Sequence, residues 1–143
     1  MPAYKLLSYH DNKEVKAGIE VDGSVFNLAS EIAFHGPGSN IDGTTLDTAI
    51  RRWSDLEPLL KKIINSPSTR AHPLNSLKLA APLYNPGTIY CAGANYFDHA
   101  EEMGTTIDKD AIEPLFFLKS CGAIVGPNDN VQLVKEYSQK YDW

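Results

Sequence analysis

The residues of this sequence that are best suited to chemistry are a histidine and a glutamate three positions apart. His99 and Glu102 fall in a polar stretch where we expect a short helix around residues 99–103. On a helical turn they share a face, so the carboxylate can orient the imidazole and raise its basicity. Histidine suits a general base because its unperturbed pKa lies nearest neutrality. The same spacing also fits an ordinary surface pair, and the two residues alone leave both interpretations open.

A lysine at the end of an apolar run is the second such feature. Lys119 follows residues 115–118, which are Leu, Phe, Phe and Leu. Its aliphatic stem can cross apolar surface so that the ammonium reaches solvent. Alternatively, the ammonium points into a site and stabilises an enolate or carboxylate oxygen. The residue types alone favour the solvent interpretation, since lysine is rarely buried.

Both features belong to a series of five short motifs. The motifs are residues 93–96, residues 99–104, Pro114 with residues 116–119, residues 124–129 and residues 141–143. In order and spacing they resemble the fumarylacetoacetate hydrolase family, and the resemblance covers residues 86–143. Residues 1–70 are similar to the variable N-terminal domain of that family in outline, as a strand, a hairpin and then helices with a tryptophan.

The resemblance implies a metal-dependent enzyme that hydrolyses, hydrates, decarboxylates or isomerises oxo-acids able to form an enolate. It also implies a mixed β-sandwich or roll, a bound Mg2+, Mn2+ or sometimes Ca2+ ion, and a homodimer. By matching motif positions, His99 would be the general base, Glu102 would orient it, and Lys119 would stabilise negative charge on the substrate. Asn95 and Tyr96 would lie at the wall of the substrate pocket, and their loop would order as a lid.

The metal ligands that the resemblance implies begin with a Glu-x-Glu pair just after an Asp-Trp step. The sequence contains no Glu-x-Glu, and Asp142 and Trp143 are its last residues. Glu101 and Glu102 are adjacent and could not both face one ion from a helix, whereas Mg2+ prefers several oxygen ligands in near-octahedral geometry. We therefore expect a truncated chain without metal ligands of its own. The alternative function is a catalytically inactive N-terminal fragment that serves only as a folded or dimer-forming module.

The elements that must position these residues divide the chain in two and give an α+β class. We expect an N-terminal α+β module over residues 1–70 and the beginning of a catalytic β-domain over residues 71–143. Asp22 and Gly23 form a strong signal for a two-residue hairpin turn. In the first module we expect a loop over residues 35–43 and strands at residues 4–9, 15–21 and 24–28.

A helical stretch follows this loop, beginning at Thr44 or Thr45 as the cap. Pro58 lacks a donor and clashes one turn back, so we expect a break near residues 54–55. Ser54 or Asp55 would then cap a second helix that carries Pro58 in its first turn. The apolar stripe that we expect to face the core comprises Leu46, Ala49, Ile50, Trp53, Leu56, Leu60, Ile63 and Ile64.

Residues 65–73 are rich in Ser and Pro and are expected to form a linker. After this linker we expect strands at residues 77–80, 88–92, 115–118, 123–125 and 131–134. A set of strands without a closing element would leave an open sheet edge, which natural domains usually cover.

Length, composition and charge exclude several classes of protein. The 143 residues are 43% hydrophobic and 22% charged, which excludes disorder over most of the chain. The net charge of -5 argues against binding to nucleic acid or anionic membranes. We find no signal peptide and no apolar run of about 20 residues. The two cysteines are too few for a disulfide framework and favour reduced thiols in the cytoplasm.

Overall fold

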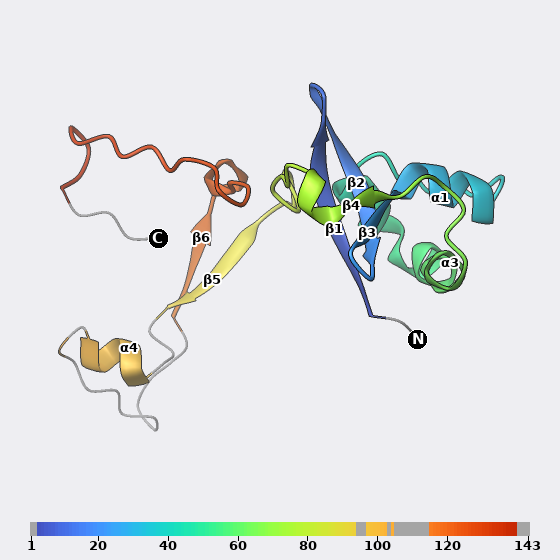
Figure 1. Cartoon of the computed structure of the whole chain (residues 1–143). Helices are drawn as coiled ribbons and strands as arrows, with labels where there is room; N and C mark the ends of the chain where they lie inside the picture. The colour runs from blue at the N-terminus through green and yellow to red at the C-terminus, as the bar shows by residue number, and fades with distance from the viewer. Residues whose placement is uncertain (1–2, 94–96, 103, 105–114, 140–143) are drawn as a thin grey trace. The chain divides into compact units, whose positions relative to one another are not determined.

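A computed structural model describes residues 3–93, 97–102, 104 and 115–139, with only the backbone of residues 97–99. Mixed helices and antiparallel sheets confirm the α+β class (Figure 1). The chain forms two compact units. Unit 1 comprises Met1–Tyr84 and Val125–Trp143, and unit 2 comprises Asn85–Ile124. The domains expected over residues 1–70 and 71–143 remain a prediction.

Unit 1 is built on a four-stranded antiparallel sheet in the order β1-β2-β3-β4. The predicted turn at Asp22 and Gly23 is confirmed, because φ is +49° and +79° there, as a type I′ turn requires. A second tight turn at Asn12, with φ of +57°, joins the first two strands and had no strong sequence signal. The strands are β1 (Tyr4–Asp11), β2 (Glu14–Val21), β3 (Ser24–Asn27) and β4 (His72–Pro73).

One helix was missed by the sequence analysis. Helix α1 (Leu28–His35) follows β3 directly, and the Asn27 side chain caps it by accepting from Ser30 N at 2.9 Å. The signal was present, since Asn is a preferred N-cap and an acidic residue, Glu31, lies in the first turn. Because the helix is short and follows a strand without a break, apolar periodicity did not predict it.

The predicted helix break lies upstream of its expected position. Thr45 caps α2 (Leu46–Ala49) as expected, a 3-10 turn η1 (Ile50–Arg52) follows, and α3 runs over Trp53–Asn65. The prediction that Ser54 or Asp55 caps α3 is wrong, because Arg52 stands at the cap and its side chain accepts no hydrogen bond from the first turn. Asp55 instead binds the guanidinium of Arg52, with Nε at 2.8 Å. Pro58 therefore lies in the second turn of α3.

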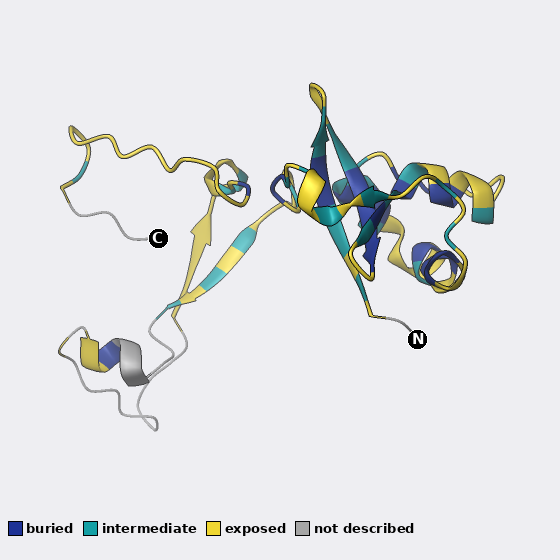
Figure 2. Cartoon of the chain, in the orientation of Figure 1, coloured by how far each residue is buried: buried dark blue, intermediate teal, exposed yellow. Residues whose placement is uncertain are grey.

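The core of unit 1 lies between the sheet and the helices, where α1 packs against β2 and α3 (Figure 2). Most of the predicted stripe is buried, but Trp53 is 43% exposed and Ile50 is half-buried, so those two assignments are wrong. The core also includes Leu59, which the stripe had omitted. Its members are Ala17, Ile19, Val21, Leu28, Ile32, Ile41, Leu46, Ala49, Leu56, Leu59, Leu60, Ile63 and Ile64.

A buried carboxylate ties α1 to the segment that was expected to be only a linker. Glu31 accepts hydrogen bonds from Thr69 N at 2.7 Å and from Ser68 N at 3.1 Å. Burial on its own would raise the pKa of Glu31, but the hydrogen bonds from Thr69 and Ser68 outweigh it and hold the pKa below its ordinary value of 4.5. His35 Nε2 lies 3.3 Å from the carboxylate, yet it makes no hydrogen bond within the described structure.

Three of the strands expected after residue 73 are not strands. Residues 77–80 follow a 3-10 turn, η2 (Leu74–Ser76), and form only an isolated bridge between Leu79 and Tyr9. Residues 123–125 include the end of a 3-10 turn, η3 (Cys121–Ala123), and residues 131–134 pair with no strand of the described chain. Apolar alternation alone was insufficient there, because a strand also needs a partner for its backbone groups.

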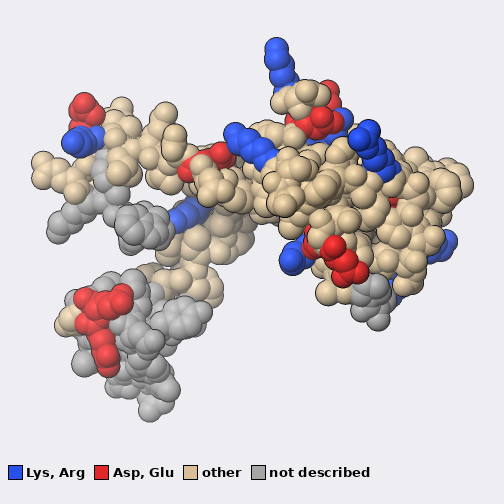
Figure 3. Space-filling view, in the orientation of Figure 1, with Lys and Arg blue, Asp and Glu red and all other residues tan. Residues whose placement is uncertain are grey.

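One face of unit 1 shows no separate patch of positive charge. On the face shown in Figure 3, its Lys and Arg side chains are dispersed among neutral and acidic residues. In the described part of the chain, no helix combines the length and apolar character needed to cross a membrane.

Candidate active site

Two strands of unit 2 hold the region in which the predicted site residues lie. Strand β5 (Ile89–Gly93) pairs antiparallel with β6 (Leu115–Lys119), and both were predicted from their branched and aromatic residues. The register places Ile89 opposite Lys119 at one end and Gly93 opposite Leu115 at the other. We call this pair of strands the β5–β6 ribbon.

The β5–β6 ribbon is apolar on both faces. Because residues opposite each other share a face, Lys119, Phe117 and Leu115 lie on the same face as Cys91. The other face carries Tyr90, Ala92, Phe116 and Leu118. Every residue of β6 is exposed in this structure (Figure 2). A strand with a continuous apolar run is typical of one that is covered on both sides.

Lys119 and Gly93 lie at opposite ends of the ribbon. Lys119 pairs with Ile89, four residues before Gly93 on β5, and four residues of a β-strand span about 13 Å. The side chain of Lys119 is exposed. The described ribbon therefore does not bring Lys119 next to the point where the chain continues toward His99.

The predicted short helix is confirmed as α4 (Phe97–Glu102). Gly104, two residues beyond the end of α4, has a φ of +69° and donates its N–H to Glu101 O at 2.9 Å. His99 and Glu102 are therefore three residues apart on one helix, and Glu102 is exposed. The side chain of His99 lies outside the described residues.

The remaining predicted site residues are not tested. Asn95 and Tyr96 lie outside the described residues, so no geometry is assigned to the substrate pocket. Cys91 is half-buried on the ribbon and Cys121 is half-buried at η3, and both are free thiols. The roles of His99, Glu102 and Lys119 remain predictions.

The residues present do not supply a divalent-metal site within the described structure. Across residues 3–93, 97–102, 104 and 115–139, no three His, Cys, Asp or Glu side chains gather closely enough to hold an ion. Mg2+ and Mn2+ require several oxygen donors around one point.

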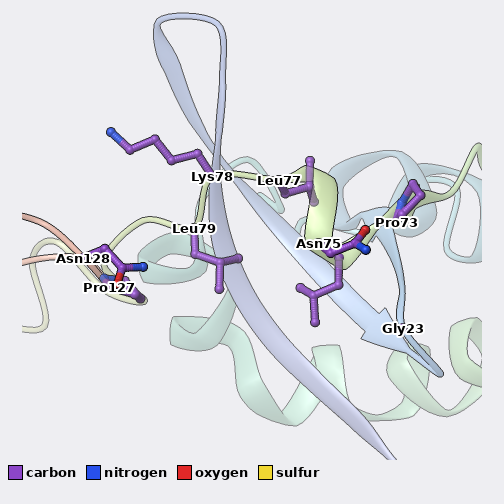
Figure 4. Close-up of a pocket in the computed structure, with 9 residues that line it drawn as sticks. Gly23, Pro73, Asn75, Leu77, Lys78, Leu79, Pro127 and Asn128 are labelled. Atoms are coloured by element: carbon purple, nitrogen blue, oxygen red, sulfur yellow. The ribbon is translucent and has the colours of Figure 1, made fainter.

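Unit 1 has a hollow with mostly apolar walls, and none of the predicted site residues line it. It has a volume of about 700 Å³, and its apolar walls include Leu74, Leu77, Leu79 and Pro127 (Figure 4). The Lys78 side chain extends away from the other lining residues in that view. The hollow holds no side chain suited to acid or base catalysis, so the chemistry of unit 2 is a better guide to function than the size of this hollow.

Residues 88–143 match the family model described as fumarylacetoacetate (FAA) hydrolase C-terminal. This match supports membership in the fumarylacetoacetate hydrolase family. The matched residues include β5, α4 and β6, which are the elements that carry His99, Glu102 and Lys119.

Curated relatives agree with membership in the fumarylacetoacetate hydrolase family. The chain is 41% identical over 69 residues to the oxaloacetate tautomerase fahd2, mitochondrial, of Xenopus laevis, covering 48% of this chain and 20% of that protein. It is 41% identical over 71 residues to the oxaloacetate tautomerase FAHD2A, mitochondrial, of Bos taurus, covering 50% of this chain and 21% of that protein.

A bacterial relative matches over a longer stretch. The putative hydrolase BamMC406_5393 of Burkholderia ambifaria is 29% identical over 141 residues, which is 97% of this chain and 43% of that protein. The match thus spans about a fifth of each tautomerase and less than half of the bacterial protein.

Proposed function

We propose that the whole protein is an enzyme that transforms an oxo-acid through an enolate, and that the reaction is a keto–enol tautomerisation. The observation that carries the proposal is the family match over β5, α4 and β6. Relatives named as oxaloacetate tautomerases favour isomerisation over the hydrolysis and decarboxylation that share the same enolate. Oxaloacetate and related short oxo-acids are the proposed substrate class.

Each predicted residue has a role in this proposal. His99 removes a proton from the carbon next to the keto group, and the electron pair of the C–H bond moves to form the enolate. The ammonium of Lys119 stabilises the enolate oxygen. His99 then returns the proton to that oxygen, so that the enol leaves with no net gain or loss of atoms. Glu102, one turn along α4, orients the imidazole.

The proposal also involves the loop that carries His99. Lys119 lies about 13 Å from the Gly93 end of the ribbon. In this proposal the loop over residues 95–104 closes over the substrate, so that His99 and Lys119 act on the same molecule. We propose this closure as the action of the lid, with Asn95 and Tyr96 at the pocket wall.

The remaining parts of the proposal concern the whole protein. We propose the mixed β-sandwich or roll of the family, a homodimer, and a bound divalent cation, which is Mg2+, Mn2+ or Ca2+. When bound, such an ion supplies positive charge near an enolate oxygen. A cytoplasmic location is proposed from the two free cysteines.

Kinetics on the full-length protein test the assignment. Conversion of oxaloacetate between its keto and enol forms is followed by absorbance, with Mg2+ present. His99→Ala and Lys119→Ala are each expected to lower kcat/KM by about 100-fold or more, as removal of a general base or of an oxyanion donor does. Lys135→Ala is the control, since Lys135 is exposed and outside the site. Unchanged turnover in His99→Ala would overturn its role as the base.

The second candidate is an inactive module that serves folding or dimer contacts. It is favoured by the independent core of unit 1 and by the missing donor cluster in the described residues. Titration calorimetry of the 143-residue chain with Mg2+ separates the two candidates. The inactive-module proposal predicts no binding heat, and micromolar binding would contradict it.

A further inference from the structure

Unit 2 is a single excursion of the chain with both ends on unit 1. The chain leaves unit 1 after Tyr84 and re-enters it at Val125. The outgoing segment is held by contacts within unit 1. Ser8 Oγ donates to Pro82 O at 2.9 Å, and Asp47 Oδ2 accepts from Tyr84 N at 2.9 Å. The outgoing segment is therefore fixed up to Tyr84, the residue after which the chain enters unit 2.

The returning chain begins with a tight turn over residues 126–129. Gly126 N donates to Asp129 Oδ2 at 2.8 Å, and Gly126 O accepts from Asp129 N at 3.1 Å. Pro127 precedes Asn128, whose φ is +66°, as in a type II turn. Gly126 is buried although both residues after it are exposed. We call residues 126–129 the return turn.

The return turn contacts the outgoing segment through Gly126 itself. A Cβ at this position would lie 2.9 Å from Ala81 N and 3.1 Å from the carbonyl carbon of Ala80. Both are backbone atoms, and Ala80 N is held by a 2.9 Å hydrogen bond to Ser8 O of β1. Neither atom can move aside without breaking contacts of the sheet. Glycine is therefore required for the return turn to close on the outgoing segment.

We propose that Gly126 is a positioning residue, and that the return turn clamps the two ends of unit 2 together and so holds Lys119 in its register on the ribbon. Lys119 is seven residues before Gly126, and its partner Ile89 is five residues after Tyr84. When the two ends of residues 85–124 are already held together, the pairing of β5 with β6 costs less conformational entropy. Gly126 acts through Lys119 and does not touch the substrate. The link to catalysis rests on the proposed function, whereas the clamp does not.

Amide hydrogen exchange on the 143-residue chain tests the clamp without any activity. In Gly126→Ala, exchange of the β5 and β6 amides is expected to accelerate by roughly tenfold or more, while the β2 and β3 amides keep their rates. The clamp would be overturned if exchange accelerated equally in the ribbon and in β2 and β3, or if ribbon exchange did not change. It would also be overturned if the ribbon amides of the parent chain were not protected from exchange. Gly122→Ala is the matched control, because a Cβ there meets only Ser120 Oγ at 3.5 Å.

A second variant keeps the test available where Gly126→Ala does not fold. Asp129→Ala removes the acceptor for Gly126 N and adds no bulk, so ribbon exchange is expected to rise by a smaller factor. Unchanged ribbon exchange in this variant, with the turn bond lost, would contradict the clamp.

The link to Lys119 needs the full-length enzyme. Gly126→Ala is expected to lower kcat with KM nearly unchanged, and to have no further effect in a Lys119→Ala background. An equal loss in both backgrounds would overturn positioning through Lys119. If the full-length protein turns over no oxo-acid, the proposed function fails, and the exchange result still decides the clamp.

Discussion

Unit 1 and the β5–β6 ribbon use the same kinds of apolar residues with opposite results. In unit 1, Ile19 and Leu60 are 0% and 1% exposed because α1 and α3 cover one face of the sheet. In the ribbon, Tyr90 and Leu118 are 72% and 64% exposed. An amphipathic element has one apolar face, which a neighbouring helix or sheet can cover. A ribbon that is apolar on both faces needs a packing partner on each face. The candidate active site lies on the element whose cover is not seen in the described residues.

The largest effect expected from this difference comes from truncating a core residue of unit 1. Leu60→Ala is expected to lower the free energy of unfolding by about 2–5 kcal/mol, because it leaves a cavity between α3 and the sheet. Urea unfolding followed by circular dichroism measures it. Leu115→Ala, at an exposed ribbon position, is the matched control and is expected to change stability by less than about 0.5 kcal/mol in this chain. Equal losses would mean that the ribbon is packed as tightly as unit 1.

A smaller effect is expected at the buried carboxylate of unit 1. Glu31→Gln weakens charge-assisted hydrogen bonds from Ser68 and Thr69, so the free energy of unfolding should fall by about 1–3 kcal/mol. Glu57→Gln is the control, since Glu57 forms an exposed pair with Lys61.

The same residue makes the stability of unit 1 depend on pH. Because the pKa of Glu31 is lower in the folded state than its ordinary 4.5, its contribution is complete above that value. It is lost as the pH falls through the folded pKa. Unfolding of the parent should therefore show a loss of stability below about pH 4.5 that Glu31→Gln reduces. Parallel pH profiles for the two proteins would contradict the assignment.

The smallest expected effect concerns the exposed ribbon surface. Phe116→Ser removes an aromatic side chain from an apolar surface without disturbing a core, so binding of an apolar fluorescent dye should fall while the unfolding midpoint stays the same. Phe34→Ser changes an equally exposed phenylalanine of α1 that lies beside His35, and dye binding should then change little. Equal decreases in the two variants would remove the distinction between the two surfaces.

The sequence could predict those elements whose signals are local. The Asp22–Gly23 hairpin, the Thr45 cap and both ribbon strands follow from turn chemistry, capping and residue type. The predictions that were wrong concern residues whose environment is set by contacts between segments far apart in the sequence. Trp53 is exposed although it fits the helical period, and residues 131–134 alternate but find no partner strand in the described chain.

The candidate site shows the same limit. Motif order was sufficient to select His99, Glu102 and Lys119, and the family model that matches residues 88–143 supports the resemblance on which that selection rests. The spacing of the motifs could not show that Lys119 lies opposite Ile89, because register is set by pairing between strands. The tight approach of Gly126 to Ala81 was equally hidden, since it joins residues distant in sequence. A Gly-Pro-Asn-Asp segment signals a turn but not what the turn contacts.

Proton abstraction by His99 is the central claim, and exchange of substrate hydrogen with solvent tests it most directly. Full-length protein and His99→Ala are each incubated with oxaloacetate in D2O, and loss of the C3 proton signal is followed by NMR. The parent is expected to accelerate deuterium incorporation over the spontaneous rate, and His99→Ala to reduce that acceleration by about 100-fold or more. Equal incorporation by the two proteins would show that His99 is not the base and would contradict the account.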